Sequence, residues 1–333
     1  MSAPSMEDRS LMHGVSPVKG DLAAHAPVQP GIAVTDGAFE MSESQNGIWR
    51  PVPLVWISVA WHLACLLALV WRPADWPYWL GLLALNHLLL TVLVFLPRNR
   101  WLGHTLTRLP PDARGRRQVA LTFDDGPDPV VTPQVLDLLD RHGARASFFC
   151  IGSRVRQHPE LVREIVARGH TVENHGDAHS PVFALWGMAR MRRDIAAMQQ
   201  SLRDAGVPPA RFFRPTAGFR NPLLDPVLAR MGLQLAMWER RSFDTRDGNP
   251  ARVLARLVRG LSAGDILLLH DGNSAATTDG RPVVLEVLPQ LLRRLQQAGL
   301  QPVPLREALA PQTSVPPDPY AQTLLARLAH QDP

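Results

Sequence analysis

From residue 117 to residue 304, short apolar runs alternate with segments of helical periodicity, and this constrains the fold more than any other feature. Such alternation predicts a parallel sheet covered by helices, either open or closed into a barrel. About seven repeats favour a small or incomplete (β/α) barrel over a doubly wound sheet, because no glycine-rich phosphate loop follows the first strand. The expected strands are 118–123, 145–151, 170–174, 210–214, 233–238, 265–270 and 301–304. The expected helices are 132–142, 159–168, 186–205, 223–231, 250–260 and 282–298.

Two uncharged apolar runs, 54–71 and 76–96, precede this region. At 1.5 Å per residue each run is roughly 27–31 Å long, which is enough to cross the hydrocarbon core of a bilayer. The runs predict a transmembrane helical hairpin over 51–97, and a pair of buried core helices is the alternative. The polar residues within the runs are expected to bond across the two helices. They are His62, Asn86 and His87. Tryptophans lie near the ends of the runs, as amphipathic rings do at membrane interfaces.

The charges beside the second run predict an orientation. An arginine-rich stretch follows it, made of Arg98, Arg100, Arg108, Arg114, Arg116 and Arg117. By the positive-inside rule this side is cytoplasmic, so everything after residue 97 is expected to face the cytosol. The periplasmic face is the alternative.

The remaining segments complete the expected domain organisation. Residues 1–50 show no hydrophobic periodicity and are expected to be a disordered tail. Residues 98–116 are expected to be a basic linker, 117–310 the α/β domain, and 311–333 a proline-rich tail with a short helix at 320–329. The net charge of +5 comes from arginines scattered along the chain, without a basic block, so nucleic-acid binding is not expected. The two cysteines cannot build a disulfide framework or a cysteine zinc site.

Residues capable of chemistry follow four of the expected strands. Taken alone, Arg214 could be an ordinary surface turn, His270 a structural histidine, and the histidine pair, four residues apart, a chance spacing. In parallel α/β folds, however, the carboxyl ends of the strands share one rim, where active sites form. The sequence therefore predicts a single site at this rim, made of Asp124, Asp125, His175, His179, Arg214 and His270.

Four motifs in this region carry a resemblance to a known family. "TFDDGPD", "NHGDAH", "FFRPTAG" and "ILLLHDG" are similar, in order and spacing, to the motifs of the polysaccharide deacetylase (NodB-homology) family, also called carbohydrate esterase family 4. The resemblance covers residues 117–305. It implies a distorted, incomplete (β/α) barrel that holds a divalent metal, often zinc. It also implies an enzyme that removes N-acetyl groups from hexosamine-containing glycans.

The resemblance also implies a role for each residue of the site. The metal ligands are Asp125, His175 and His179. The general base is Asp124, the general acid is His270, and Arg214 holds Asp124 in place. The implied reaction is hydrolysis of an amide, in which the metal polarises the acetamide carbonyl and lowers the pKa of a bound water toward ~7.

Two further assignments are less direct. The backbone N–H of Ala217 would hold the oxyanion. Asp247, in "FDTRDGN", either pairs with Arg214 or lies in an exposed turn.

Four positions depart from the family pattern. Gly176 replaces a serine or threonine, so the histidine motif is expected to be less braced. Thr216 and Ala217 stand where the family has proline and an aromatic residue, and Gly248 stands where it has tryptophan. The loss of two aromatic rings predicts an altered substrate pocket with the chemistry retained.

The expected function is metal-dependent removal of N-acetyl groups from an N-acetylhexosamine glycan or its precursor. A hairpin in a bacterial inner membrane and a cytoplasmic catalytic domain favour lipid-linked sugars of the undecaprenyl-phosphate type, with membrane lipid as a further partner. Peptidoglycan or an exported polymer is the alternative substrate and requires the opposite orientation. A non-catalytic glycan-binding module and a membrane anchor for a partner enzyme are the alternatives from other classes.

Overall fold

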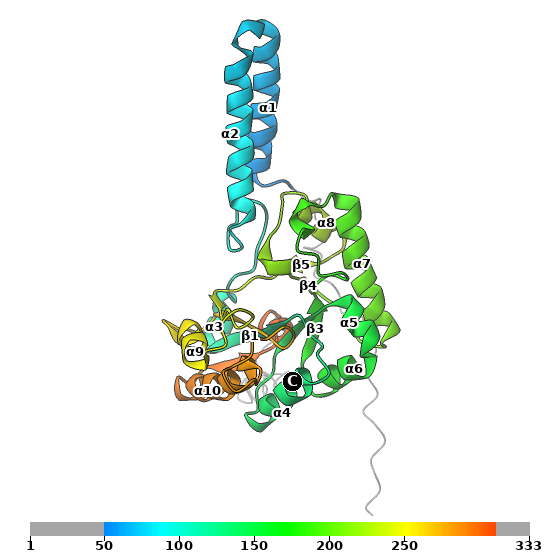
Figure 1. Cartoon of the computed structure of the whole chain (residues 1–333), viewed down its shortest axis with the longest axis vertical. Coiled ribbons are helices and arrows are strands. Elements are labelled where there is room, and N and C mark those ends of the chain that lie inside the picture. Colours follow the sequence, from blue (N-terminus) through cyan, green and yellow to red (C-terminus); the bar gives the residue numbers. More distant parts are fainter. Residues whose placement is uncertain (1–49, 311–333) are drawn as a thin grey trace, which may run out of the picture. The chain divides into compact units, whose positions relative to one another are not determined.

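The computed structural model describes residues 50–310 (Figure 1). The tail helix expected at 320–329, the expected N-terminal tail up to residue 49 and the proline-rich tail lie outside the described residues.

Eight parallel strands form one sheet in the described part of the chain, in the order β5-β4-β3-β2-β1-β7-β6, with β8 also pairing with β1. The seven expected strands are all present, most of them shorter than expected, and a two-residue strand, β6, was not expected. The bounds are β1 Gln118–Asp124, β2 Ser147–Cys150, β3 Thr171–Asn174, β4 Phe212–Phe213, β5 Gln234–Leu235, β6 Arg240–Arg241, β7 Ile266–His270 and β8 Gln301–Val303.

The sheet is curled, because its two edge strands are nearly consecutive in the chain. β5 and β6 end opposite sides of the sheet, yet only residues 236–239, the closing segment, separate them. Five Cα steps extend over at most about 17 Å, so the two edges must come close together. The sheet is therefore an incomplete barrel, as expected.

Helices surround this sheet (Figure 1) and follow the expected pattern, with additional short elements. The six expected helices are α4 Val131–Arg141, α6 Pro159–Ala167, α7 Met188–Asp204, α8 Leu224–Arg230, α9 Pro250–Val258 and α10 Val283–Gln297. The additional ones are α3 Pro111–Gly115, α5 Gly152–Gln157, α11 Leu305–Ala308 and the 3-10 turns η3 Phe183–Leu185 and η4 Thr216–Gly218.

The central strand β1 is buried on both faces, and the two faces have different surroundings. Val119, Leu121 and Phe123 pack into the main apolar core with residues of α4 and α10. The alternate residues Thr122 and Asp124 point to the opposite face, as the strand geometry requires. This inner face of the barrel is polar toward the carboxyl end of β1, and the site lies there.

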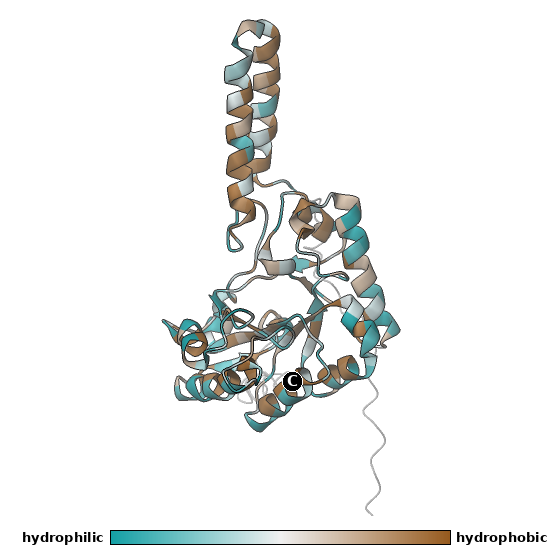
Figure 2. Cartoon of the chain, viewed as in Figure 1, coloured by the Kyte–Doolittle hydropathy of each residue, from teal (hydrophilic) through white to brown (hydrophobic). Residues whose placement is uncertain are grey.

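The two apolar runs form helices α1 Pro53–Trp71 and α2 Trp76–Val94, joined by the 3-10 turn η2 Pro73–Asp75. Both helices are long and apolar enough to cross a membrane, by length and composition, and hydrophobic residues make up much of both helices in Figure 2. Only 11% and 0% of their most apolar windows are buried, so the alternative of a buried core pair is wrong. The helices are compatible with a membrane anchor or a signal sequence.

Polar side chains connect α1 to α2, as expected. Asn86 Nδ2 donates to Ser58 Oγ at 2.9 Å, and His62 Nε2 lies 3.3 Å from His87 Nε2. In an apolar environment such contacts between helices satisfy polar groups that water does not reach.

Residues 98–116 are not a free linker, because they pack on the domain. Leu102 and Leu109 are buried, Leu106 forms a parallel bridge with Ala236, and Arg108 Nη2 lies 2.7 Å from the buried Asp265. Buried leucines between the arginines therefore attach this segment to the sheet.

Candidate active site

Two adjacent carboxylates end β1, and the backbone turns both toward one pocket. Asp124 continues the inner face of the strand after Thr122. Asp125 leaves the strand with φ of 72°, a left-handed conformation that aspartate adopts more readily than most residues. On a regular strand Asp125 would point to the opposite face, whereas here both carboxylates line the same pocket.

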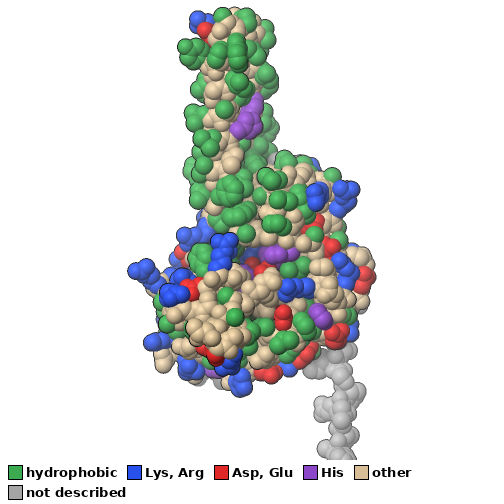
Figure 3. All heavy atoms as spheres, viewed as in Figure 1, with side chains coloured by type: hydrophobic (Ala, Val, Ile, Leu, Met, Phe, Trp, Pro, Cys, Tyr) green, Lys and Arg blue, Asp and Glu red, His purple; other side chains and the backbone are tan. Residues whose placement is uncertain are grey.

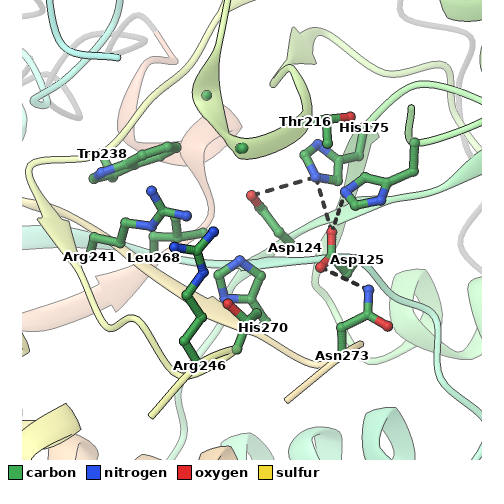
Figure 4. A pocket seen from close by; sticks show the side chains of 14 residues that line it. Asp124, Asp125, His175, Thr216, Trp238, Arg241, Arg246, Leu268, His270 and Asn273 are labelled. Carbon is green, nitrogen blue, oxygen red and sulfur yellow. Dashed lines mark hydrogen bonds and ion pairs between the residues drawn. The ribbon is translucent and has the colours of Figure 1, made fainter. Parts of the chain in front are cut away.

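Asp125 meets the two histidines that follow β3. Its Oδ1 lies 3.2 Å from His175 Nε2 and 2.9 Å from His179 Nε2 (Figure 4). These three donor atoms all lie within 4.8 Å of one another. One carboxylate and two imidazoles are a ligand set that zinc and related divalent metals accept, so the three residues form a possible metal site.

A hydrogen bond prepares His175 for metal binding. Its Nδ1 lies 2.7 Å from the carbonyl oxygen of Arg214, so Nδ1 carries the proton and donates it there. Nε2, which faces Asp125, is therefore the nitrogen that a metal would bind, and contacts of this kind orient metal-bound histidines.

The ionisation of Asp125 also suits a cation. Burial alone would raise the pKa of Asp125, but hydrogen bonds with His175 and His179 outweigh burial and hold the pKa well below its usual range. Asp125 is therefore a carboxylate at all physiological pH values.

The second carboxylate, Asp124, is held by the expected arginine. Arg214 Nη1 donates to Asp124 Oδ1 at 2.6 Å and to Thr122 Oγ1 at 3.0 Å. The fully buried guanidinium also donates to the carbonyl oxygens of Ala236 and Met237, in the closing segment. Burial lowers the pKa of Arg214, and the adjacent Asp124 opposes that shift. Asp124 thus has a fixed orientation and a permanent counter-charge.

His270, at the end of β7, has a carboxylate partner that the sequence analysis missed. Its Nδ1 lies 2.6 Å from Asp244 Oδ1, and its backbone N–H donates to Asp244 Oδ2 at 2.9 Å. Burial would lower the pKa of His270, but Asp244 outweighs it and raises the pKa to about 9. His270 is therefore protonated at neutral pH. The available signal was the motif "FDTRDGN", which contains Asp244 as its first acid.

The pairing considered between Asp247 and Arg214 is wrong. Asp247 Oδ1 and Oδ2 lie 2.7 Å and 2.8 Å from Arg252 and Arg256 of α9. The second acid of the motif thus fastens its turn to the next helix. Ala217, the other uncertain residue, lines the pocket with φ of 56°.

The pocket has a volume of about 200 Å³. It is lined by all the expected site residues except Arg214 and Asp247, and also by Trp238, Arg241 and Asn273, which no motif indicated, and by Arg246 of the motif "FDTRDGN". Figure 3 shows histidine, acidic and basic side chains together on the face in view.

The aromatic surface of the pocket comes from a different element than in the family pattern. A Cβ at Gly248 would lie 1.9 Å from the carbonyl oxygen of Ala276, so no tryptophan fits there. Trp238, from the closing segment, lines the pocket and lies next to Gly218. Trp238 therefore gives the pocket an aromatic ring, although positions 217 and 248 carry none.

Known proteins are similar in sequence to this chain. A peptidoglycan-N-acetylglucosamine deacetylase of Bacillus cereus is 34% identical over 194 residues, which cover 57% of this chain and 87% of the relative. A chitooligosaccharide deacetylase of a Bradyrhizobium species is 35% identical over 205 residues, covering 58% and 91%. Fold, site and relatives define the class: hydrolases of carbon–nitrogen bonds that deacetylate carbohydrates.

Two further comparisons concern the family of this chain within that class. The polysaccharide deacetylase family model matches residues 112–236. The solved structure of a family 4 carbohydrate esterase from Streptomyces lividans, in complex with acetate, matches with a TM-score of 0.50 and 33% identity, covering 56% of this chain and 91% of that one. The chain belongs to the polysaccharide deacetylase family.

Proposed function

We propose that this protein removes the N-acetyl group from N-acetylhexosamine units of a glycan or a lipid-linked sugar precursor, with a zinc ion held by Asp125, His175 and His179. The observation that carries the proposal is the separation of roles around one pocket. One carboxylate faces the two imidazoles, a second is held by a buried arginine, and a protonated histidine completes the set.

Each of these side chains has a distinct task in amide hydrolysis. When bound, the metal supplies Lewis acidity and a nucleophilic water near neutral pH. Asp124, oriented by Arg214, takes the proton of the attacking water as general base. The N–H of Ala217 donates to the developing oxyanion. His270, protonated because of Asp244, gives its proton to the leaving amine.

Release of acetate tests the proposal. The purified full chain, loaded with zinc in detergent, is incubated with N-acetylglucosamine oligosaccharides and with lipid-linked N-acetylglucosamine. We expect equimolar acetate and free amine from at least one of them, and loss of the reaction on metal removal. Absence of acetate from every acetylated hexosamine, with zinc bound stoichiometrically, would contradict the proposal.

The alternative, a glycan-binding module without activity, is tested by the same protein. A module would bind acetylated glycans equally well with Asp124→Ala and release no acetate in either form. The complete set of acid, base and metal-site side chains favours the enzyme.

The membrane part of the proposal rests on α1 and α2. We propose that residues 51–97 anchor the protein in a bacterial inner membrane and that the catalytic domain, 117–310, faces the cytoplasm. The exposed apolar surfaces of both helices support the anchor, and the arginines after α2 support the orientation. A cytoplasmic face would give access to lipid-linked sugars at the bilayer surface, whereas peptidoglycan or an exported polymer requires the periplasmic face.

A further inference from the structure

Two arginines line the pocket beside the proposed catalytic groups. Arg241 ends β6, and Arg246 lies in the turn before α9. Their guanidinium groups lie near each other between Trp238 and His270 (Figure 4). The guanidinium carbon of Arg241 is 5.1 Å from the centre of the Trp238 ring and 4.8 Å from that of Phe243. The aromatic rings thus fix the direction of Arg241.

Within residues 50–310, neither side chain has an ion-pair partner, and the buried Nε of Arg241 has no hydrogen-bond partner. Two other arginines near this turn, Arg252 and Arg256, share Asp247. Burial lowers the pKa of Arg241, and the charge of Arg246 acts in the same direction, whereas the nearby Asp124, Asp244 and Asp125 oppose the shift. Two adjacent cations repel each other, and an anion bound between them would offset that repulsion.

The acids near Arg241 are already engaged with other partners. Asp124 is paired with Arg214, and Asp244 is paired with His270. Asp125 faces the histidines and accepts a hydrogen bond from Asn273 at 3.0 Å. A metal bound at Asp125 would add positive charge to the pocket. None of these carboxylates forms an ion pair with Arg241 or Arg246, so both guanidinium groups can accept an anionic group that enters the pocket.

We propose that Arg241 and Arg246 form an anion subsite that binds a phosphate group carried by the acetylated sugar. This inference rests on the proposed function and narrows its substrate class to hexosamines bearing a phosphate ester. Two guanidinium groups present several N–H donors in planar forks, which match the oxygens of phosphate better than one carboxylate. The same pocket contains the acid and the base, so phosphate and acetamide belong to one substrate molecule.

Two sources of such a phosphate are chemically equivalent at the arginines. One is a soluble sugar phosphate, and the other is a sugar joined through phosphate to a membrane lipid. The proposed membrane anchor, α1 and α2, would bring a lipid-linked sugar close to the pocket. Phe95, just after α2, packs edge-on against Phe219, with 5.1 Å between ring centres. Phe219 directly follows η4, and Ala217 and Gly218 of η4 line the pocket.

Kinetics with charged and neutral substrates test the subsite. The full chain with zinc is assayed on N-acetylglucosamine 1-phosphate, on polyprenyl-phosphate-linked N-acetylglucosamine in detergent, and on neutral N-acetylglucosamine oligomers. Arg246→Gln removes an exposed cation without disturbing the core. We expect kcat/KM to fall roughly 10- to 100-fold on the phosphorylated substrates, mainly through KM, and to fall by a clearly smaller factor on the neutral oligomers. Arg241→Gln is expected to act in the same way, and Arg192→Gln, an exposed arginine of α7, is the matched control.

A binding measurement separates this inference from the proposed function. Asp124→Asn protein, which retains the subsite, is titrated with N-acetylglucosamine 1-phosphate by calorimetry, with and without Arg246→Gln. Binding that is unaffected by Arg246→Gln would overturn the subsite, even if wild-type protein releases acetate from neutral oligomers. Binding that depends on Arg246, without acetate release from any substrate, would retain the subsite and reject the proposed function.

A comparison of the losses on the different substrates identifies the source of the phosphate group. A loss confined to the lipid-linked or to the soluble phosphate supports the subsite and names its source. An equal loss on neutral oligomers would overturn it.

Discussion

Single residues at the carboxyl ends of the strands determine the chemistry of this protein. Asp124 and Asp125 are neighbours in the chain but have separate surroundings: Arg214 holds the first, and His175 and His179 face the second. Identical side chains therefore have different tasks because of their contacts.

Substitution of each group should separate metal binding from turnover. We expect Asp124→Asn to retain zinc and to lower kcat by about 10²- to 10⁴-fold, because a general base is lost. We expect His175→Ala to lose zinc, because one of three ligands is gone. Metal content measured by atomic absorption and acetate release check both. Equal zinc content in the two variants would contradict the assigned roles.

The pair of His270 and Asp244 predicts a pH dependence. A general acid must be protonated, so activity should fall as pH rises through the pKa of His270, which Asp244 raises to about 9. In Asp244→Asn that pKa should fall toward 6.5, so the basic limb of the pH profile of kcat/KM should move to lower pH.

Asp247→Asn is the matched control, because it changes the other acid of the same motif. The ion pairs of Asp247 in the described structure are with two arginines of α9. A basic limb that moves equally in both variants would argue against the assignment of Asp244.

The residues that sequence could predict are those with a recognisable motif at a strand end. Asp125, His175, His179 and Arg214 were found in this way, because parallel strands place their carboxyl ends on one rim. Asp244 was missed as the partner of His270, because the two are 26 residues apart and are brought together by the pairing of the two-residue strand β6 with β7. Trp238 and Arg241 carry no motif, and only the folded chain places them at the pocket.

At the level of elements, long segments were easier to predict than short ones. The amphipathic helices α4, α7 and α10 end within two residues of the expected bounds. β6 has two residues, too few for a period of two to appear in the sequence. The bracing of the histidine turn was also not visible. Asp194 of α7 accepts hydrogen bonds from the N–H groups of Asp177 and Ala178, at 3.0 Å each. The expected weakness at Gly176 is thus compensated.

The turn at Gly248 makes a prediction about packing. A Cβ there would lie 1.9 Å from the backbone oxygen of Ala276, which cannot rotate away as a side chain would. We expect Gly248→Ala to lower the free energy of unfolding by about 1–3 kcal/mol, measured by urea denaturation. Gly115→Ala, with nothing within 4 Å, should leave stability equal or slightly higher. Equal stability of the two variants would show that the turn can shift.

At the level of the whole molecule, the catalytic domain is joined to two helices with exposed apolar surfaces. The proposed orientation predicts the location of the domain. A reporter fused after residue 310 should be active if it works in the cytoplasm and inactive if it works only in the periplasm, because the arginines after α2 stay on the cytoplasmic side.

A matched fusion within the turn between α1 and α2 should give the opposite result. Activity of the periplasmic reporter alone, after residue 310, would exclude cytoplasmic lipid-linked precursors as substrates.

The closing segment connects the shape of the sheet with the position of Arg214. Ala236 and Met237 lie in the piece of chain that brings the two edges of the sheet together, and their carbonyl oxygens also fix Arg214. Barrel integrity and alignment of the proton acceptor therefore depend on the same few peptide groups. We expect a fluctuation that opens the barrel on this side to release the guanidinium from Asp124, the proposed general base. We therefore expect catalytic activity to require that the two edges of the sheet stay close together.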